Sequence, residues 1–177
     1  MVGTDGGVEG DLGSAAVTDI RPILNAALAL LPQQMDSAPA RVQLVAIGLQ
    51  ESRLTERRQL VGNPPKPVGP AKGLWQFERL GGCRGVVSHA ASSYWMNEVC
   101  QKRGVTFTAT AVWNAIEFDD VLACAAARLL LFTDPRRLPA VGDADDAWRL
   151  YMRTWKPGKP HRATWPALYA QALAFAT

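Results

Sequence analysis

Residues 40–54, ARVQLVAIGLQESRL, constrain the fold of this chain more than any other segment. Apolar side chains recur at helical spacing on two sides of the segment. A helix that is apolar on more than one face belongs inside a domain. The sequence therefore predicts a buried central helix, with Glu51 at the point where this helix should end.

The expected position of Glu51 has a chemical consequence. Burial beside apolar side chains and closeness to the negative end of a helix both disfavour a carboxylate, so we expect the pKa of Glu51 to be raised. A carboxyl group that stays protonated near neutral pH can act as a general acid. The alternative is a surface glutamate that forms an ion pair with Arg53 or Arg57.

The remaining sequence favours an all-α fold of seven or eight helices. The 177 residues suffice for one hydrophobic core. We expect one domain at residues 18–177, preceded by a flexible lead-in, rich in glycine and acids, at residues 1–17. The proline-rich residues 62–70 predict a loop, and residues 105–108 are the one stretch that favours a strand. Helices are expected at residues 20–31, 40–54, 74–80, 88–103, 110–116, 121–132, 143–155 and 165–173.

Charge and composition bear on the class of partner. A net charge of +3 does not by itself indicate a nucleic-acid-binding protein, and we expect none. No apolar run reaches the length of a membrane span, so we expect no stable membrane insertion. Basic residues interleave with Trp148, Tyr151 and Trp155 near the C-terminus. This tract is either a solvated helix face above buried rings or a surface for phosphates or an anionic sugar polymer.

The cysteines and histidines do not form a metal-site pattern. Cys83, Cys100 and Cys124 are widely spaced, and His89 and His161 are far apart in sequence. We therefore expect no metal or cofactor, and we expect reduced thiols in or near the core. One disulfide with one free thiol is the alternative.

Three short motifs, in a fixed order, resemble those of the soluble lytic transglycosylases, a family of the lysozyme-like superfamily. That family has a Glu-Ser pair at the end of a buried helix, then a Gly-Leu-Met-Gln turn, then an Ala-Tyr-Asn motif after a helix rich in alanine and leucine. The resemblance covers residues 42–158, with a longer and more proline-rich loop after the first motif. The corresponding residues here are Glu51-Ser52, Gly73-Leu74-Trp75-Gln76 and Leu150-Tyr151-Met152.

The resemblance implies a lysozyme-like fold and cleavage of the β-1,4 bond between N-acetylmuramic acid and N-acetylglucosamine in peptidoglycan. Glu51 would protonate the departing sugar oxygen and then take the proton of the muramic acid C6 hydroxyl, which closes a 1,6-anhydro ring. The resemblance also implies substrate contacts from Ser52, Trp75, Gln76 and Tyr151. Glycan strands are then the expected partner, and we expect a monomer unless the protein is part of a virion.

Two other functions stay open. A muramidase would activate water with a second carboxylate, for which Glu78 is a better candidate than Glu56, Asp119 or Asp120. A non-catalytic module for wall binding or virion assembly would retain the scaffold without turnover. Because the sequence has no signal peptide pattern, we expect synthesis in the cytoplasm. Action on the cell wall would follow release as a phage endolysin or delivery as a virion component.

Overall fold

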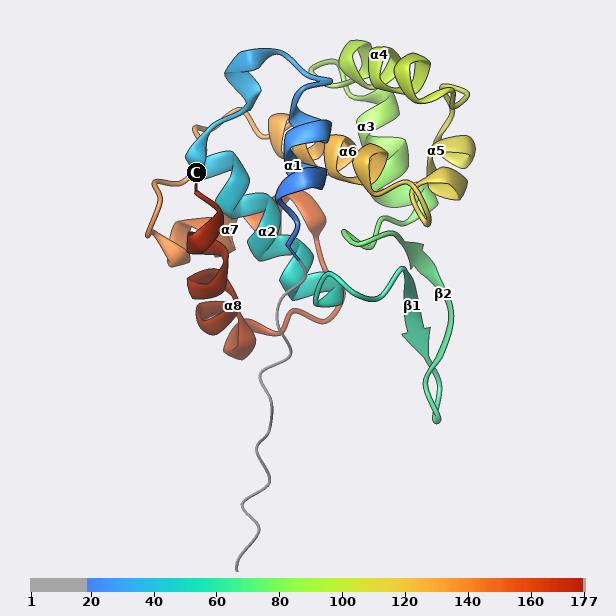
Figure 1. Ribbon diagram of the computed structural model, residues 1–177. Helices are drawn as coiled ribbons and strands as arrows, with labels where there is room; N and C mark the ends of the chain where they lie inside the picture. Colours follow the sequence, from blue (N-terminus) through green and yellow to red (C-terminus); the bar gives the residue numbers. More distant parts are fainter. Residues whose placement is uncertain (1–18, 177) are drawn as a thin grey trace, which may run out of the picture.

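The computed structural model describes residues 19–176, and helices dominate this part of the chain (Figure 1). The expected all-α class is confirmed, with one short β-hairpin added. Residues 1–17, the expected lead-in, lie outside the described residues. The α-helices are α1 (Arg21–Leu28), α2 (Ala38–Ser52), α3 (Arg84–Ser88), α4 (Ser93–Arg103), α5 (Ala109–Ala115), α6 (Asp120–Phe132), α7 (Ala144–Trp155) and α8 (Trp165–Ala172). Shorter helical segments are η1 (Gln33–Met35), η2 (Arg79–Cys83), η3 (Arg162–Thr164) and η4 (Leu173–Phe175).

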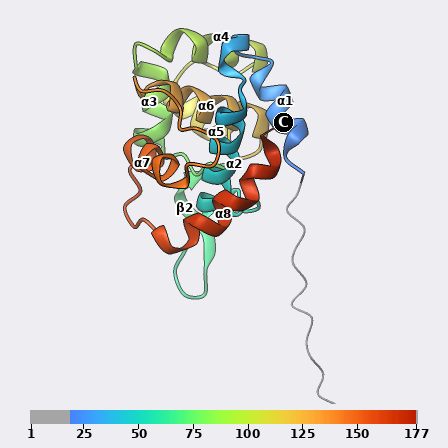
Figure 2. The same cartoon turned by 90° about the vertical axis from the view of Figure 1, so that its left-hand side faces the viewer.

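Helix α2 is the buried centre of the fold, as the sequence predicts. It begins at Ser37, whose hydroxyl oxygen accepts a hydrogen bond from the N–H of Ala40 at 3.3 Å and so caps the helix. Every residue from 42 to 49 is buried, because α6, α8 and η4 all pack against α2 (Figures 1 and 2). The helix ends at Ser52. Glu51 therefore lies in its last turn.

Local capping rules account for several of the other helix ends. Asp119 and Asp143 each accept a hydrogen bond from a backbone N–H three residues further on, both at 2.9 Å, and they begin α6 and α7. Gly104 ends α4 in the left-handed conformation with φ 67°. These ends agree with the sequence predictions.

The single helix predicted at residues 88–103 is wrong at its N-terminal end. Helix α3 ends at Ser88, and α4 begins at Ser93 after a short turn. Ser92 is fully buried in this turn, and its hydroxyl donates to the carbonyl of Val86 at 2.9 Å. The hydrogen bond compensates for burial of the hydroxyl and separates the two helices.

A β-hairpin stands where the sequence predicts a proline-rich loop. Strand β1 (Arg58–Val61) pairs antiparallel with β2 (Lys66–Lys72), and the hairpin projects from the helical body (Figure 1). Prolines are tolerated here because each strand has only one neighbour, so a missing N–H need not remove a ladder hydrogen bond. The predicted loop at 62–70 is therefore wrong in part. The predicted strand propensity at 105–108 is not realised: residues 105 and 106 have no regular structure, and residues 107 and 108 form a bend before α5.

A tight turn replaces the helix predicted at residues 74–80. Gly73 and Gln76 both adopt left-handed backbone conformations, with φ 73° and 51°. Lys72 and Phe77 exchange two backbone hydrogen bonds of 3.1 and 2.9 Å and close the turn. Left-handed residues at both ends prevent a right-handed helix from forming. The chain then enters η2, a short helical segment that is kinked at Gly81, whose backbone angles are not helical (φ −98°, ψ −107°).

We predict that Gly73→Ala destabilises the fold much more than Gly104→Ala. Both glycines have positive φ, which costs other residues about 1–2 kcal/mol. A Cβ at Gly73 would also lie 2.6 Å from the carbonyl oxygen of Ile116, whereas a Cβ at Gly104 would meet nothing within 4 Å. Urea denaturation of both variants should give a loss of about 1 kcal/mol for Gly104→Ala and at least about 3 kcal/mol for Gly73→Ala. Equal losses would contradict the tight packing of the turn against α5.

Candidate active site

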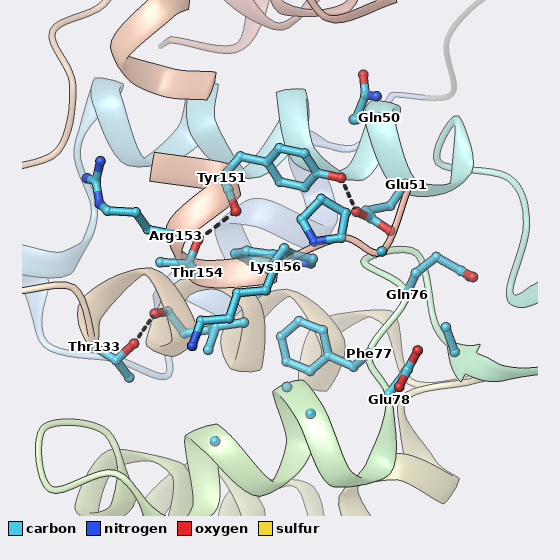
Figure 3. A pocket seen from close by; sticks show the side chains of 18 of the residues that line it. Gln50, Glu51, Gln76, Phe77, Glu78, Thr133, Tyr151, Arg153, Thr154 and Lys156 are labelled. Atoms are coloured by element: carbon cyan, nitrogen blue, oxygen red, sulfur yellow. Dashed lines mark hydrogen bonds between the residues drawn. The ribbon is translucent and has the colours of Figure 1, made fainter. Parts of the chain in front are cut away.

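Glu51 lines a cleft of about 1130 Å³ (Figure 3). The walls of the cleft come from the end of α2, the segment after the tight turn, α3, the C-terminal half of α7 and the loop at 156–161. Glu51 also lines a smaller hollow of about 330 Å³ beside the β-hairpin. Open space therefore extends from this carboxyl group both toward α7 and toward the hairpin.

The carboxyl group of Glu51 is held by Tyr151. The phenolic hydroxyl of Tyr151, on α7, donates to Oε1 of Glu51 at 2.6 Å (Figure 3). The alternative ion pairs of Glu51 are not formed: Arg57 pairs with Asp120, and Arg53 donates to carbonyl groups at the end of α2. The first and third motifs of the sequence thus meet at one hydrogen bond.

The surroundings of Glu51 favour its protonated form. Burial raises the pKa of Glu51 to about 7, and the hydrogen bond from Tyr151 opposes part of this rise. The expected direction of the shift is confirmed. Burial, and then the negative charge and hydrogen bond of Glu51, raise the pKa of Tyr151, so its hydroxyl stays a donor. Near neutral pH, Glu51 therefore exists both as an acid and as a carboxylate.

Aromatic packing fixes the position of the Tyr151 ring. Trp165 stacks on this ring at 5.5 Å between centroids and 12° between planes. The indole N–H of Trp165 donates to the carbonyl of Ala144 at 2.8 Å, which ties α8 to the start of α7. Trp148 packs against both rings. Trp165 is fully buried, so it anchors this aromatic cluster in the core.

Ser52 and Trp75 support the site from inside the protein, which corrects their predicted role as substrate contacts. Their exposed fractions are only 5% and 1%. The Ser52 hydroxyl donates to the carbonyl of Leu74 at 2.7 Å, and the Trp75 indole N–H donates to the carbonyl of Leu44 at 2.9 Å. Both side chains fasten the tight turn to α2, so neither has a polar group free for a sugar.

Gln76 lines the cleft as the sequence predicts, on the same segment as Phe77 and Glu78 (Figure 3). Its amide nitrogen donates to the carbonyls of Gly73 and Glu56 at 2.9 and 3.2 Å. These bonds hold the side chain in place. Its amide oxygen takes no hydrogen bond from the described residues, so this is the atom that can accept one from a ligand.

The cleft contains one further carboxylate without a protein partner. Glu78 is exposed, lines the cleft and has no ion pair within residues 19–176. Asp119 and Asp120 are engaged, because they pair with Arg103 and Arg57. Glu56 lines the smaller hollow beside the β-hairpin, so of the acids considered as a second carboxylate Glu78 is the one at the main cleft.

Several residues of the cleft were not singled out as site residues from the sequence. The basic tract near the C-terminus is the sequence signal for the cationic residues among them, whereas the glycines after Glu78 are equally typical of loops. Their position in the cleft follows only from the tertiary structure, which places α3 and α7 around the same cleft. They are Gln50, Phe77, Gly81, Gly82, Gly85, Arg153, Lys156, Lys159 and His161.

The thiols take no part in the cleft. Cys83, Cys100 and Cys124 are free and buried, in agreement with the sequence prediction. Burial raises the pKa of Cys83 to about 12 and that of Cys100 to about 11, so both stay protonated. The described part of the chain has no group of three or more His, Cys, Asp or Glu side chains placed to hold a metal ion. It also has no helix long and apolar enough to cross a membrane.

Because the pKa of Glu51 is raised in the folded protein, we expect the free energy of unfolding to fall as the pH rises. The folded protein keeps this proton until about pH 7, whereas the unfolded chain loses it near pH 4.5. Between these values the folded state binds more protons, so the free energy of unfolding should fall by up to about 3 kcal/mol. Glu51→Gln should remove this part of the pH dependence, as measured by urea denaturation at about pH 5 and about pH 8. Glu98→Gln, on α4, is the control and should retain the pH dependence of the wild type. An equal pH dependence of the free energy of unfolding in all three proteins would contradict the raised pKa of Glu51.

We further predict that Tyr151→Phe raises the pKa of Glu51. The phenolic hydroxyl stabilises the carboxylate form, and phenylalanine keeps the ring packing against Trp165 while it removes this donor. Carbon NMR titration of labelled glutamate carboxyl groups measures the change without any substrate. A lower or unaltered pKa in Tyr151→Phe would show that the hydrogen bond does not stabilise the anion.

The comparisons with known proteins leave the site to be interpreted from its own chemistry. The cleft, the buried acid and its phenolic donor define what reaction this chain can support. No protein-family model, no curated protein and no solved structure matches the chain.

Proposed function

We propose that this protein is a lytic transglycosylase that cleaves the β-1,4 bond between N-acetylmuramic acid and N-acetylglucosamine in peptidoglycan. The observation that carries the proposal is Glu51: a largely buried carboxyl group with a pKa of about 7, held by Tyr151 in a cleft of about 1130 Å³. The order of motifs that resembles the transglycosylase family supports it. A lysozyme-like arrangement, with a buried helix that ends at the acid, is the fold that we infer from the same features.

In the first step, protonated Glu51 donates its proton to the glycosidic oxygen. The bond between this oxygen and C1 of muramic acid breaks, and positive charge develops on the sugar ring. The transfer leaves Glu51 as a carboxylate in a mostly buried position. The hydroxyl of Tyr151, 2.6 Å away, then stabilises the negative charge that the transfer creates.

In the second step, the Glu51 carboxylate takes the proton of the muramic acid C6 hydroxyl. The hydroxyl oxygen bonds to C1 and closes the 1,6-anhydro ring, and Glu51 returns to its protonated form. The step needs no activated water and therefore no second carboxylate. A pKa near neutrality suits a group that must both donate and accept a proton.

Glu78 favours a second function, that of a muramidase. It is an unpaired carboxylate on the same cleft and could activate a water molecule in place of the C6 hydroxyl. Its exposure speaks against this role, because an exposed glutamate is neither positioned by the protein nor desolvated. We therefore place the transglycosylase reaction first.

The proposed activity would place the action of the protein at the cell wall. Release as a phage endolysin or delivery in a virion are the two routes that we propose. A non-catalytic wall-binding module is the remaining alternative, and turnover separates it from both enzymes.

We predict that the wild-type protein releases fragments with 1,6-anhydro ends from purified cell walls. Mass spectrometry distinguishes them, because each is lighter by one water molecule than the product of hydrolysis. Glu51→Gln should reduce the rate at least about a hundredfold, since it removes the proton donor and keeps the shape of the side chain. Glu98→Gln, away from the cleft, should leave the rate unchanged.

The products also decide between the alternatives. Reducing ends without anhydro sugar, lost on Glu78→Gln, would establish the muramidase. Full activity of Glu51→Gln would rule out Glu51 as the acid. Wall binding without any released fragment would replace both enzymes by the binding module.

A further inference from the structure

Charged side chains are distributed unevenly along the cleft. The acids Glu51 and Glu78 belong to the α2 end and the segment after the tight turn. Asp134, farther along, is neutralised by Arg153 at 2.7 Å. Lys156 and Lys159 line the cleft on the loop after α7, and neither forms an ion pair within residues 19–176. The loop therefore presents positive charge that the described protein does not neutralise.

The loop that carries these lysines is fixed in place. Its N-terminal end is Lys156 itself, which ends α7 in the left-handed conformation with φ 49°. Its C-terminal end is fastened to α2, because the amide nitrogen of Gln50 donates to the carbonyl of His161 at 3.1 Å. Thr164 donates to the amide oxygen of the same Gln50, also at 3.1 Å. The residue before Glu51 thus holds the cationic loop.

Figure 3 shows the Lys156 side chain extended along the cleft, toward the side where Thr133 lies. Lys156 lines the cleft, and its side chain is exposed and accessible to a ligand. An ammonium group in this position is available for an anionic group of a bound ligand.

The wall formed by η2 and α3 is lined by glycines that leave room. A Cβ added to Gly85 would meet only Leu130, at 3.8 Å, and one added to Gly81 only Glu78, at 3.6 Å. These are ordinary contact distances, so packing within the protein does not require glycine at either position. Glycine also disfavours helix formation at Gly85. The backbone angles of Gly81, φ −98° and ψ −107°, lie outside the regions that other residues favour and account for glycine at that position. Space for a ligand is the explanation that remains for Gly85.

We propose that this part of the cleft, which Lys156, Lys159 and Gly85 line, is a subsite for the carboxylate-bearing substituent of the glycan strand, with the two lysines as its cationic groups. The substituent is the lactyl group of muramic acid together with the peptide attached to it. The proposal rests on the proposed function, because it names the substrate feature that the same cleft recognises. A neutral polymer of N-acetylglucosamine has no carboxylates and would gain nothing from the two lysines.

The test measures binding without cleavage, with Glu51→Gln present in every protein compared. The probes are peptidoglycan strands that carry stem peptides and chito-oligosaccharides of equal length, with Trp155 fluorescence as the signal because its ring lines the cleft. Lys156→Gln/Lys159→Gln should weaken binding of the peptidoglycan strand about fivefold, as expected for two solvent-accessible ion pairs. Binding of the neutral oligosaccharide should not change.

The matched control is Lys66→Gln/Lys102→Gln, which removes the same charge at positions outside the cleft. It should bind both probes as the parent does. Loss of binding in this control equal to that in the cleft variant would reduce the effect to net charge and overturn the subsite. Equal weakening of both probes by Lys156→Gln/Lys159→Gln would also overturn it, because the lysines would then contact the sugars themselves.

A second variant tests the glycine wall independently. Gly85→Ala should leave thermal stability unaltered or raised, because it favours the helix and creates no clash. It should nevertheless weaken binding of the peptidoglycan strand. Undiminished binding would show that the space beside Gly85 is not occupied by the ligand. A different result would contradict the proposed function itself: no release of fragments from cell walls by the wild-type protein. Fragment release with no effect of the lysines would leave that function intact and remove only the subsite.

Discussion

The C-terminal end of α2 is the constraint on which the rest of the structure depends. After a buried helix, the chain has to return to the surface. Here the segment that follows α2 packs closely against the end of the helix. A Cβ at Gly48 would lie 2.3 Å from Leu54, so the chain that follows the helix folds back directly against it. Ser52 and Trp75 then bond the tight turn to the same helix. Glu51 is the ionisable group in the last turn of α2, and it opens into the cleft.

The position of Glu51 represents a compromise between stability and chemistry. Its burial disfavours the anion, so ionisation near neutral pH costs folding free energy. A fully apolar site would raise the pKa further and make the carboxyl group a weaker proton donor. The hydroxyl of Tyr151 limits the shift, because it stabilises the carboxylate. A carboxyl group that must both donate and accept needs burial and a donor together.

The sequence was sufficient where local rules decide the structure. Asp119, Asp143 and Gly104 form caps that follow from residue type alone, and the apolar periodicity of residues 40–54 predicts a buried helix. It was insufficient where long-range contacts decide. The tight turn depends on the approach of Gly73 to the carbonyl of Ile116, and no local pattern encodes that contact. Ser52 was misjudged for the same reason, because its inward orientation depends on a carbonyl from the turn.

Helix α7 explains why Met152, which stands in place of the asparagine in the motif that the sequence resembles, does not disturb the hydrogen bond to Glu51. Successive turns of one helix face put Tyr151 on Glu51 and Trp155 on the cleft wall, where its indole N–H donates to the carbonyl of Trp75. Met152 is on another side of the helix, half-buried against the core. An apolar side chain suits that place, whereas the donor to the acid comes from Tyr151 alone. Glu51 therefore does not need a polar group at position 152 for its hydrogen bond. The aromatic packing around Tyr151 holds the hydroxyl that orients the acid.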